Sequence, residues 1–420
     1  MTEVAIIGFG SRGQNFARLL REEQNARLTA IAEPVETLRR QAEEQFGVSK
    51  ERCFSDADEF FARGKMCDAV FICTQDAQHC EMALRALELG YDICLEKPAA
   101  VTIEECENIR DTANRLGRKV MLTHVLRYAP FYGYIKKLIS DGTLGDIVDM
   151  DLTENVAYWH FALSYVRGPW RDMEKSTPTI IAKCCHDLDL IQWLMNKKCT
   201  QVSSYGQLYY FRPDHAPAGS AEYCTDCAAE TREACPYNAY RVYPERVTQG
   251  VVGGTARLKG RDIFEVIDNK EDIISRCVFH CDNDAVDNQV VNLCFADGST
   301  AHLTMTAFSE DCHRTICVHG TEGEVFGDCE EAKLYVNHFG KSCTVVDINE
   351  LEREKNKSID LSGGHGGGDY YLLKDFLDYI TVCSPSMTRT TIDDSVESHI
   401  IGFKAEESRL NGGKSIDLQK

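Results

Sequence analysis

Val4-Ala5-Ile6-Ile7-Gly8-Phe9-Gly10-Ser11-Arg12-Gly13 is the stretch that decides the fold of the first part of the chain. Its apolar run predicts a strand, and the G-x-G-x-x-G that follows opens an amphipathic helix. Gly8 allows a tight turn, Gly10 allows a pyrophosphate to approach the backbone, and Gly13 allows the helix to pack on the strand. Amide groups at a helix start attract phosphates. The pattern predicts a dinucleotide-binding turn.

Glu33 follows the next apolar run, Leu28–Ala32. A carboxylate at the end of the second strand accepts hydrogen bonds from the ribose hydroxyls of adenosine and repels a 2′-phosphate, so NAD is expected rather than NADP. The residues predicted to bind the cofactor are Gly8, Phe9, Gly10, Ser11, Arg12, Gly13, Glu33, Thr74, Glu96 and Lys97.

The hydrophobic pattern changes once along the chain. Up to about residue 120, short apolar runs such as Ala69–Ile72 alternate with helical stretches, which indicates a parallel sheet. Later runs alternate apolar and polar residues, and the runs Gln289–Phe295 and Ala301–Thr306 flank Asp297-Gly298, which predicts an antiparallel hairpin. The expected architecture is an α/β Rossmann domain over 1–123 and an α+β domain with an open, mostly antiparallel sheet over 124–420, with a Cys-rich excursion at about 209–244.

Composition excludes several classes of protein. The 420 residues carry 46 basic and 66 acidic side chains, hence 46 − 66 = −20, which disfavours nucleic acids and anionic membranes as partners. The chain starts without a signal-peptide pattern, and no apolar run reaches about 18 residues. A cytoplasmic protein is expected, with most of its twenty cysteines reduced.

Lys97 lies in Glu96-Lys97-Pro98, directly after the apolar run Asp92–Leu95. The carboxyl ends of parallel strands form the ligand-binding edge of such sheets. An ammonium group there can bond to a substrate hydroxyl and stabilise the alkoxide that forms as hydride leaves. Lys97 is therefore predicted to be catalytic.

His186 lies in a stretch with helical periodicity, Lys183–Leu194. On one continuous helix Lys183, His186 and Asp187 would share a face, and the neighbouring charge of Lys183 would lower the pKa of His186. A neutral histidine suits a base, so His186 is predicted to be catalytic, and Lys183 is a third catalytic candidate.

Together, GFGSRG, AEP at Glu33, EKP at Lys97 and HDLDLIQWL resemble the glucose-fructose oxidoreductase, inositol dehydrogenase and MocA (Gfo/Idh/MocA) family. The segments VLRYAPFYGYIKKLISDGTLGDI, RGPW and GGHGGGDYYLLKDF extend the resemblance over nearly the whole chain. The resemblance implies a Rossmann domain and an open-sheet domain with NAD or NADP between them, and chemistry on sugars, polyols and related carbonyl compounds. It makes Lys97 the catalytic lysine, with a cis bond to Pro98, and His186 the catalytic histidine.

Ala182 departs from the family pattern, because many of these dehydrogenases have an aspartate four residues before the histidine. The aspartate-assisted proton relay of the polyol dehydrogenases is thus not expected here. Lys183 would replace part of it and favour an alkoxide or enolate, as in a sugar-oxidising subgroup.

Cys224, Cys227 and Cys235 form a C-x2-C-x7-C pattern within the excursion. The first spacing suits two thiolates on one Zn or iron, and a loop with little core gains stability from a metal. A structural Zn or other metal is predicted, with His215 or another cysteine as the fourth ligand. A chance cluster in a cysteine-rich chain is the alternative. Hydride transfer to NAD itself needs no metal.

Candidate substrate ligands come from aromatic, basic and glycine-rich segments. They are Lys97, His160, Arg167, Trp170, His186 and His365. Stacking and hydrogen bonding by such side chains suit a sugar pocket.

The predicted function is an NAD-dependent oxidoreductase that transfers a hydride between a ring carbon of a sugar or glycoside and the nicotinamide. Three alternatives stay open: a redox-neutral NAD-dependent glycosidase with a transient 3-keto intermediate, a non-catalytic NAD- and sugar-binding regulator, and a redox or metal sensor built on the cysteine cluster. A homo-oligomer, dimer or tetramer, would cover the apolar side of the open sheet.

Overall fold

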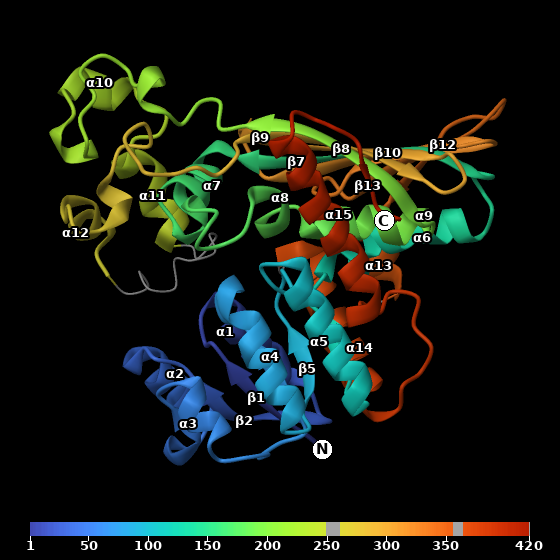
Figure 1. The fold of residues 1–420 in the computed structure, drawn as a ribbon, viewed down its shortest axis with the longest axis horizontal. Helices are drawn as coiled ribbons and strands as arrows, with labels where there is room; N and C mark the ends of the chain where they lie inside the picture. The colour runs from blue at the N-terminus through green and yellow to red at the C-terminus, as the bar shows by residue number, and fades with distance from the viewer. Residues whose placement is uncertain (249–260, 356–363, 420) are drawn as a thin grey trace. The chain divides into compact units, whose positions relative to one another are not determined.

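The computed structural model describes residues 1–248, 261–355 and 364–419 (Figure 1). These form two compact units. The first unit comprises Met1–Met150, Cys185–Lys198 and Cys317–Phe403, and the second comprises Asp151–Cys184, Cys199–Ile316 and Lys404–Lys420. The boundary near residue 123 expected from the sequence stays a prediction.

A six-stranded parallel sheet forms the Rossmann part of the first unit, as expected, with the order β3-β2-β1-β4-β5-β6. Ile7 at the end of β1 lies beside Ala32 of β2 and Ile72 of β4, so the carboxyl ends of these strands meet at one edge. The strands are β1 (Thr2–Ile7), β2 (Ala26–Ala32), β3 (Cys53–Phe54), β4 (Ala69–Ile72), β5 (Asp92–Leu95) and β6 (Val120–Leu122). Between them run α1 (Ser11–Glu22), α2 (Glu36–Phe46), η1 (Lys50–Arg52), α3 (Ala57–Phe61), η2 (Asp76–Gln78), α4 (His79–Glu88) and α5 (Ile103–Leu116).

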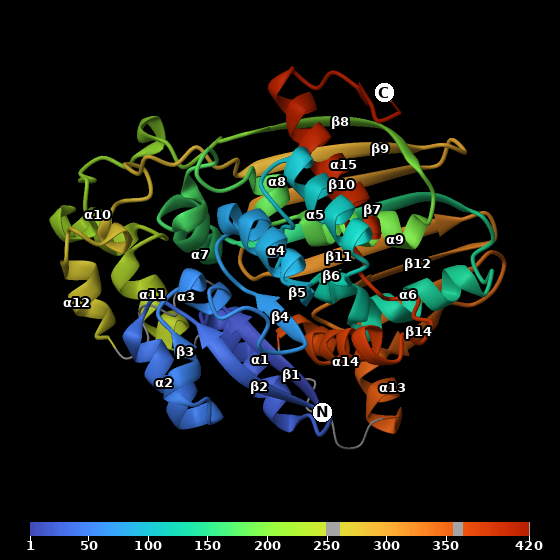
Figure 2. The same ribbon diagram turned by 60° about the horizontal axis from the view of Figure 1, so that its bottom comes forward.

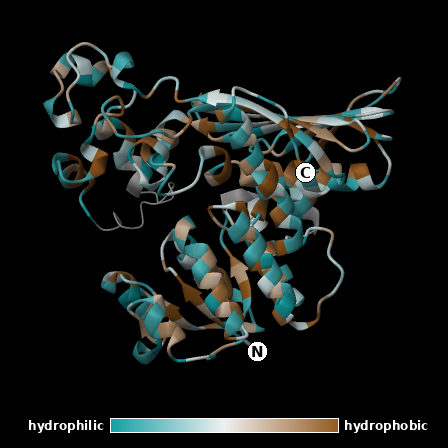
Figure 3. Cartoon of the chain, viewed as in Figure 1, coloured by the Kyte–Doolittle hydropathy of each residue, from teal (hydrophilic) through white to brown (hydrophobic). Residues whose placement is uncertain are grey.

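Each face of this sheet has its own core, because successive side chains of a strand point to opposite faces. Ile7 and Val70 belong to one hydrophobic cluster, and Ile6 and Phe71 belong to the other. Strands buried on both faces are apolar throughout, and Figure 3 accordingly colours β1 and β5 mostly brown.

The rest of the first unit is largely helical. Its helical elements are η3 (Val125–Tyr128), α6 (Pro130–Ser140), α9 (Cys185–Met195), α13 (Ile348–Lys355), η10 (Gly364–Gly367), α14 (Gly368–Thr381) and the larger part of α15 (Ile392–Leu410). Phe376 of α14 packs in one Rossmann core and Val396 of α15 in the other. Segments remote in sequence thereby complete the cores of the N-terminal sheet.

The second sheet is mostly antiparallel and has the order β14-β13-β12-β11-β7-β10-β9-β8-β15. The predicted hairpin is confirmed, since Leu303 of β10 pairs with Val291 of β9. The strands are β7 (Ile147–Ala157), β8 (Cys199–Gln207), β9 (Asn288–Phe295), β10 (Thr300–Ser309), β11 (His313–Gly320), β12 (Gly323–Asp328), β13 (Lys333–His338), β14 (Thr344–Asp347) and β15 (Ile416–Asp417).

The connection from β8 to β9 contains no named strand in its described part and holds the predicted excursion at about 209–244. Its helices α10, α11 and α12 lie together in both views of the chain (Figures 1 and 2). Tyr243 and Ile267 of this connection share a small core with Trp159. The helical elements of the second unit are α7 (Tyr158–Phe161), η4 (Ala162–Val166), η5 (Pro169–Arg171), α8 (Thr179–Ala182), η6 (Pro213–His215), η7 (Cys224–Asp226), α10 (Ala229–Ala234), α11 (Ala239–Thr248), α12 (Ile263–Asp268) and η9 (Ile273–Ser275).

Within the described residues, no helix combines the length and the apolar character needed to cross a bilayer.

Candidate active site

The glycine-rich turn between β1 and α1 has space on only one side. A Cβ on Gly8, whose φ is +87°, would lie 2.5 Å from the Cys73 carbonyl oxygen, and a Cβ on Gly13 would lie 2.2 Å from that of Gly8. A Cβ on Gly10 would meet no atom within 4 Å. Helix α1 has no side-chain cap at Gly10. The open approach to Gly10 and the uncapped amides of α1 fit a phosphate group.

Glu33 holds this turn from the end of β2. Its carboxylate accepts hydrogen bonds from the amides of Phe9 (2.7 Å) and Val35 (2.9 Å). Each carboxylate oxygen keeps a further lone pair, so Glu33 retains acceptor capacity for ribose hydroxyls. Thr74, after β4, adds a buried hydroxyl that has no hydrogen-bond partner among the described residues. The turn and these two side chains fit a dinucleotide without a 2′-phosphate.

Arg12 connects the turn to the residue before Lys97. Its Nε donates to Oε1 of Glu96 at 2.5 Å, and its Nη2 donates to Oδ1 of Asp369 at 2.7 Å. Burial lowers the pKa of Arg12, but the two carboxylates outweigh this effect and raise it well above its ordinary value. The Arg12 guanidinium is thus committed to protein carboxylates, while its backbone remains part of the predicted phosphate site.

Lys97 follows β5 at the carboxyl edge of the sheet. Its amide donates to Glu96 Oε2 and to Thr123 Oγ1, both at 3.2 Å. The Lys97–Pro98 bond is cis, as the family resemblance implied. The Pro98 carbonyl oxygen lies 2.6 Å from His79 Nδ1. Contacts from three directions thus hold the backbone that carries Lys97.

Three histidines form a buried cluster beside Lys97. The ring of His124 lies 5.6 Å from those of both His186 and His399, between centroids. Burial lowers the pKa of His124 well below its ordinary value, and the charges of Arg127 and Lys97 lower it further. His124 therefore stays neutral, with Lys97 and His186 both in its immediate surroundings. The sequence interpretation missed His124 and His399, because neither belongs to a short motif.

Arg127 and Asp189 form a buried ion pair next to this cluster. Arg127 Nε and Nη2 donate to the two Asp189 oxygens at 2.7 and 2.6 Å. Asp189 lies on α9, one turn after His186. A bidentate pair of this kind fixes geometry, so it holds α9, and with it His186, against η3.

His399 connects α15 to the segment after Lys97. Its Nε2 accepts a hydrogen bond from the Ala99 amide at 2.9 Å, and its Nδ1 donates to the Ser395 carbonyl oxygen at 2.7 Å. Burial, followed by the effect of His124, lowers the pKa of His399 to about 4. A neutral ring with its proton on Nδ1 satisfies both bonds.

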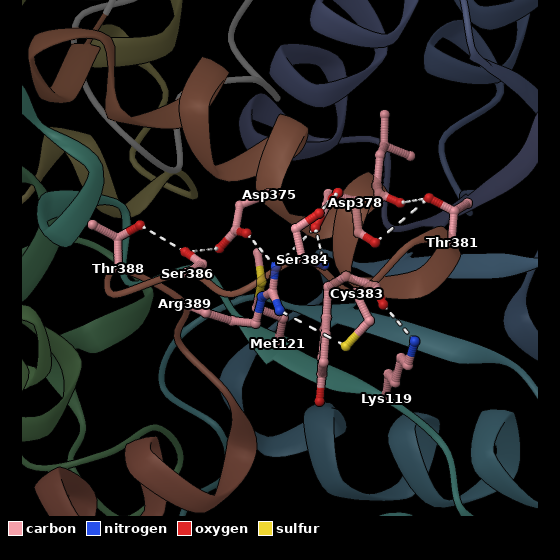
Figure 4. Close-up of polar contacts among 12 residues, drawn as sticks. Lys119, Met121, Asp375, Asp378, Thr381, Cys383, Ser384, Ser386, Thr388 and Arg389 are labelled. Atoms are coloured by element: carbon pink, nitrogen blue, oxygen red, sulfur yellow. Dashed lines mark hydrogen bonds and ion pairs between the residues drawn. The ribbon is translucent and has the colours of Figure 1, made fainter.

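The loop from α14 to α15 is held by an arginine, as Figure 4 shows. Arg389 Nη2 donates to Asp375 at 2.6 Å and to Asp378 at 3.2 Å. The next residue, Thr390, exchanges backbone and side-chain bonds with Leu122 of β6. This network fixes the start of the helix that carries His399.

Lys183 differs from its predicted placement. Helix α8 ends at Ala182 and α9 begins at Cys185, so Lys183 and His186 do not share one continuous helix. In the second unit, the Lys183 ammonium pairs with Glu154 at 2.9 Å. Burial lowers the pKa of Lys183, but Glu154 more than offsets this and raises it above its ordinary value. Lys183 is thus a permanent cation rather than a base.

The guanidinium of Arg167 is buried and makes its contacts within the second unit. It donates to the Arg276 carbonyl oxygen (2.6 Å), to the Tyr237 carbonyl oxygen (3.3 Å), to Cys224 Sγ (3.6 Å) and to the Tyr243 hydroxyl. These contacts use all three nitrogens and leave one N–H of Nη1, so the role of Arg167 as a substrate ligand stays a prediction.

The other substrate candidates lie in different elements. His160 Nδ1 lies 3.3 Å from Cys312 Sγ in the second unit. Trp170 lies in η5, half-buried, 5.9 Å from Tyr165 between ring centroids. His365 belongs to η10, but its side chain is outside the described part of the structure.

The predicted metal ligands Cys224, Cys227 and Cys235 lie around one small cavity. A compact metal site would bring at least three ligand atoms within 4.8 Å of one another. Within the described residues the three cysteines do not meet this condition, whereas Cys317, His319 and Glu324 do. His215 does not line this cavity. It packs on Tyr209 and Tyr210 and lines a second, adjoining cavity of about 400 Å³, which shares Cys235 with the first.

Comparison with known proteins identifies the two halves of the chain. Residues 2–124 match the oxidoreductase family with an NAD-binding Rossmann fold, and residues 136–399 match the C-terminal alpha/beta domain of the same family.

Curated relatives are distant. The Bacillus subtilis protein YteT is 24% identical over 325 residues, covering 76% of this chain and 74% of YteT. The inositol 2-dehydrogenase/D-chiro-inositol 3-dehydrogenase of Lactiplantibacillus plantarum is 27% identical over 51% of this chain and 56% of its own. A 2,7-anhydro-N-acetylneuraminate hydratase of Mediterraneibacter gnavus is 28% identical over 48% and 51%. For the latter two relatives the alignment thus spans about half of their length.

Solved structures share the whole fold. An inositol dehydrogenase homologue from Azotobacter vinelandii, complexed with NAD+, aligns with a TM-score of 0.70 at 17% identity, over 99% of this chain and 97% of its own. The glycine-rich turn at Gly8–Gly13 and the matches over both halves lead to one conclusion: the chain is an oxidoreductase of the Gfo/Idh/MocA family.

Proposed function

We propose that this oxidoreductase uses NAD to oxidise or reduce a hydroxyl-bearing ring carbon of a sugar or glycoside. The observation that carries the proposal is the position of Lys97 and His186 around His124 in the same unit as the Gly8–Gly13 turn. The inositol dehydrogenases and the hydratase among the relatives support a polyol or sugar substrate.

NAD, when bound, accepts the hydride that leaves the substrate carbon with its electron pair. The chain has to take the proton of the hydroxyl group and stabilise the negative oxygen that results. Lys97 donates a hydrogen bond to this oxygen, and His186 accepts the proton of the substrate hydroxyl group. Neutral His124 supplies no competing charge, and the Arg127–Asp189 pair holds His186 in place.

The proposal also includes groups that bind the substrate, namely Lys183, His160, Trp170 and His365. Lys183 acts there as a fixed positive charge that donates hydrogen bonds, since Glu154 keeps it protonated. His160 and Trp170 offer a ring nitrogen and an aromatic face, which suit the polar edges and the apolar faces of a sugar.

The proposal has three further parts. They are a structural metal on Cys224, Cys227 and Cys235, a homo-oligomeric state and a cytoplasmic location. The twenty cysteines are free thiols in the structure, which is typical of proteins in a reducing compartment. The exposed Tyr205 of β8 and Phe326 of β12 support coverage of the open sheet by another copy of the chain.

A redox-neutral glycosidase is the second candidate. The hydratase relatives and an alpha-N-acetylgalactosaminidase of Bacteroides fragilis, 28% identical over 36% of this chain, favour it. In that reaction a ketone at C3 acidifies the C2 hydrogen, a base removes it, and the C1 substituent leaves with a proton. Water then adds at C1, C2 regains a proton, and the hydride returns to C3.

One experiment separates these functions. The purified protein is incubated with NAD and a panel of free sugars, polyols and chromogenic glycosides, and NADH and released aglycone are measured in the same wells. NADH formation supports the dehydrogenase, and aglycone release without net NADH supports the glycosidase. If neither forms although NAD binds, the catalytic proposal is wrong and a regulator is favoured.

A further inference from the structure

We propose that Cys224, Cys227, Cys235 and Cys277 together bind one zinc-class metal ion, which stabilises the connection between β8 and β9. The inference extends the metal proposal above by assigning the fourth ligand. It concerns only the second unit and is independent of the redox chemistry at Lys97, so the two can fail separately.

All four cysteines line the same cavity, although Cys277 lies far from the others in sequence. The cavity has a volume of about 20 Å³. A cavity of about 10–15 Å³ is large enough for one water molecule. This cavity therefore suits a single ion and is too small for a large cluster. Four thiolates around a single ion form a closed structural site of the zinc type.

Backbone contacts bring Cys277 beside the C-x2-C segment. Tyr223 and Arg276 form an antiparallel bridge, and the Cys277 amide donates to the Glu222 carbonyl oxygen at 2.8 Å. Cys224 and Cys277 directly follow the two bridged residues. The bridge therefore brings the two cysteine-bearing segments together independently of any bound metal, with Cys224 and Cys277 as diagonal neighbours across it.

Arg167 indicates that this cavity holds negative charge. Among the described residues no carboxylate pairs with its buried guanidinium, whose side-chain neighbours are Tyr243 and Cys224. A buried cation without a carboxylate needs another anion, and metal-bound thiolates supply one.

Arg167 offsets part of the charge that metal binding creates. Four thiols lose their protons to solvent and bind a divalent ion as thiolates, which gives a complex of charge −2, half of which Arg167 neutralises. The Ala221 amide also donates to Cys227 Sγ at 3.4 Å, as in many metal–thiolate sites.

Metal binding requires the thiols to move closer together. Tetrahedral ligands at about 2.3 Å from Zn lie about 3.8 Å from one another. No three of these sulfur atoms all lie within 4.8 Å of one another in the described structure. Rotation of the cysteine side chains about χ1 provides the closure, and the cavity provides the space.

The test measures metal in the full-length protein. The protein is produced with added Zn2+, passed through a desalting column, and analysed by mass spectrometry for metals; Co2+ replaces Zn2+ in a second preparation. We expect about one Zn2+ per chain, and in the Co2+ form visible bands of a tetrahedral four-thiolate site, a readout that needs no variant. We expect the Cys277→Ser variant to lose the ion and the Cys294→Ser variant, a matched control on β9, to retain it. This pair of results would assign Cys277 as the fourth ligand.

Two further variants sharpen the result. Cys281→Ser retains the ion if Cys277 is the ligand, because Cys281 does not line the cavity. Arg167→Gln lowers zinc affinity by about 10- to 100-fold, the range typical of outer-shell partners. Full metal content in Cys277→Ser, absence of metal from the wild-type protein, or iron with sulfide in place of Zn2+ would each overturn the proposal.

Discussion

At the scale of single residues, Lys97 is the group on which the proposed chemistry depends most. An alkoxide forms poorly without a donor, and general acid–base groups contribute about 10²- to 10⁴-fold to rate. We expect Lys97→Ala to lower kcat by about this factor and to leave the Kd for NAD within about threefold. Steady-state kinetics with the best sugar and NAD titration measure the two quantities.

Lys50→Ala is the matched control, since Lys50 is exposed and lies outside the site. A Lys97→Ala variant with unchanged kcat would remove Lys97 from the mechanism. A variant that lost NAD binding instead would make Lys97 a cofactor ligand only.

Glu33 is the residue expected to set the choice between NAD and NADP. Its carboxylate is held by the amides of Phe9 and Val35, so its negative charge faces the expected position of the ribose. A hydrogen bond to a charged group contributes about 1.5–3 kcal/mol, hence roughly 10- to 100-fold in affinity. We expect Glu33→Gln to lower the NAD/NADP affinity ratio at least about tenfold in calorimetric titrations, whereas exposed Glu36→Gln leaves it unchanged.

At the scale of elements, the contact between α15 and the segment after Lys97 is sensitive to acid. The folded protein keeps His399 neutral because its pKa is lowered to about 4, whereas the unfolded chain protonates it near its ordinary value of about 6.5. Stability from this group is therefore present above pH 6.5 and is lost as the pH falls towards 4.

The free energy of unfolding should thus fall by about 2 kcal/mol between pH 7 and pH 5 through His399 alone. Urea unfolding at several pH values measures the slope. His399→Gln should flatten it, and an unchanged slope in that variant would contradict the neutral state of His399. His302→Gln, on β10, is a control histidine.

The loop between α14 and α15 depends on Arg389. Its side chain is 9% exposed and bonds to both Asp375 and Asp378, so its removal leaves two half-buried carboxylates with fewer partners. We expect Arg389→Ala to lower the free energy of unfolding by about 2 kcal/mol, as measured by urea unfolding. The surface variant Lys404→Ala should change it by less than about 0.5 kcal/mol, and equal effects of the two would contradict the role of the loop.

At the scale of the whole molecule, the cofactor residues and the cysteine cavity belong to different compact units. Each site is completed within its own unit, so their binding energies should be nearly independent. We expect Cys277→Ser to retain the Kd for NAD within about threefold, and Lys97→Ala to retain the full metal content. A large cross-effect in either direction would show that the two sites are coupled.

The sequence by itself determined the Rossmann sheet, the NAD-binding turn and the role expected of Glu33. These depend on local patterns: a glycine where a Cβ would collide with a carbonyl oxygen, and strands that are apolar because both faces are buried. The family, the cis bond at Pro98 and the β9–β10 hairpin also followed from short motifs.

Only the tertiary structure decided which distant residues accompany the motifs. It placed His124 and His399 beside His186, interrupted the helix between Lys183 and His186, and buried Arg167 against the cysteine cavity, which it closed with Cys277. Such contacts depend on the packing of segments far apart in the chain, and a local pattern carries no information about that packing.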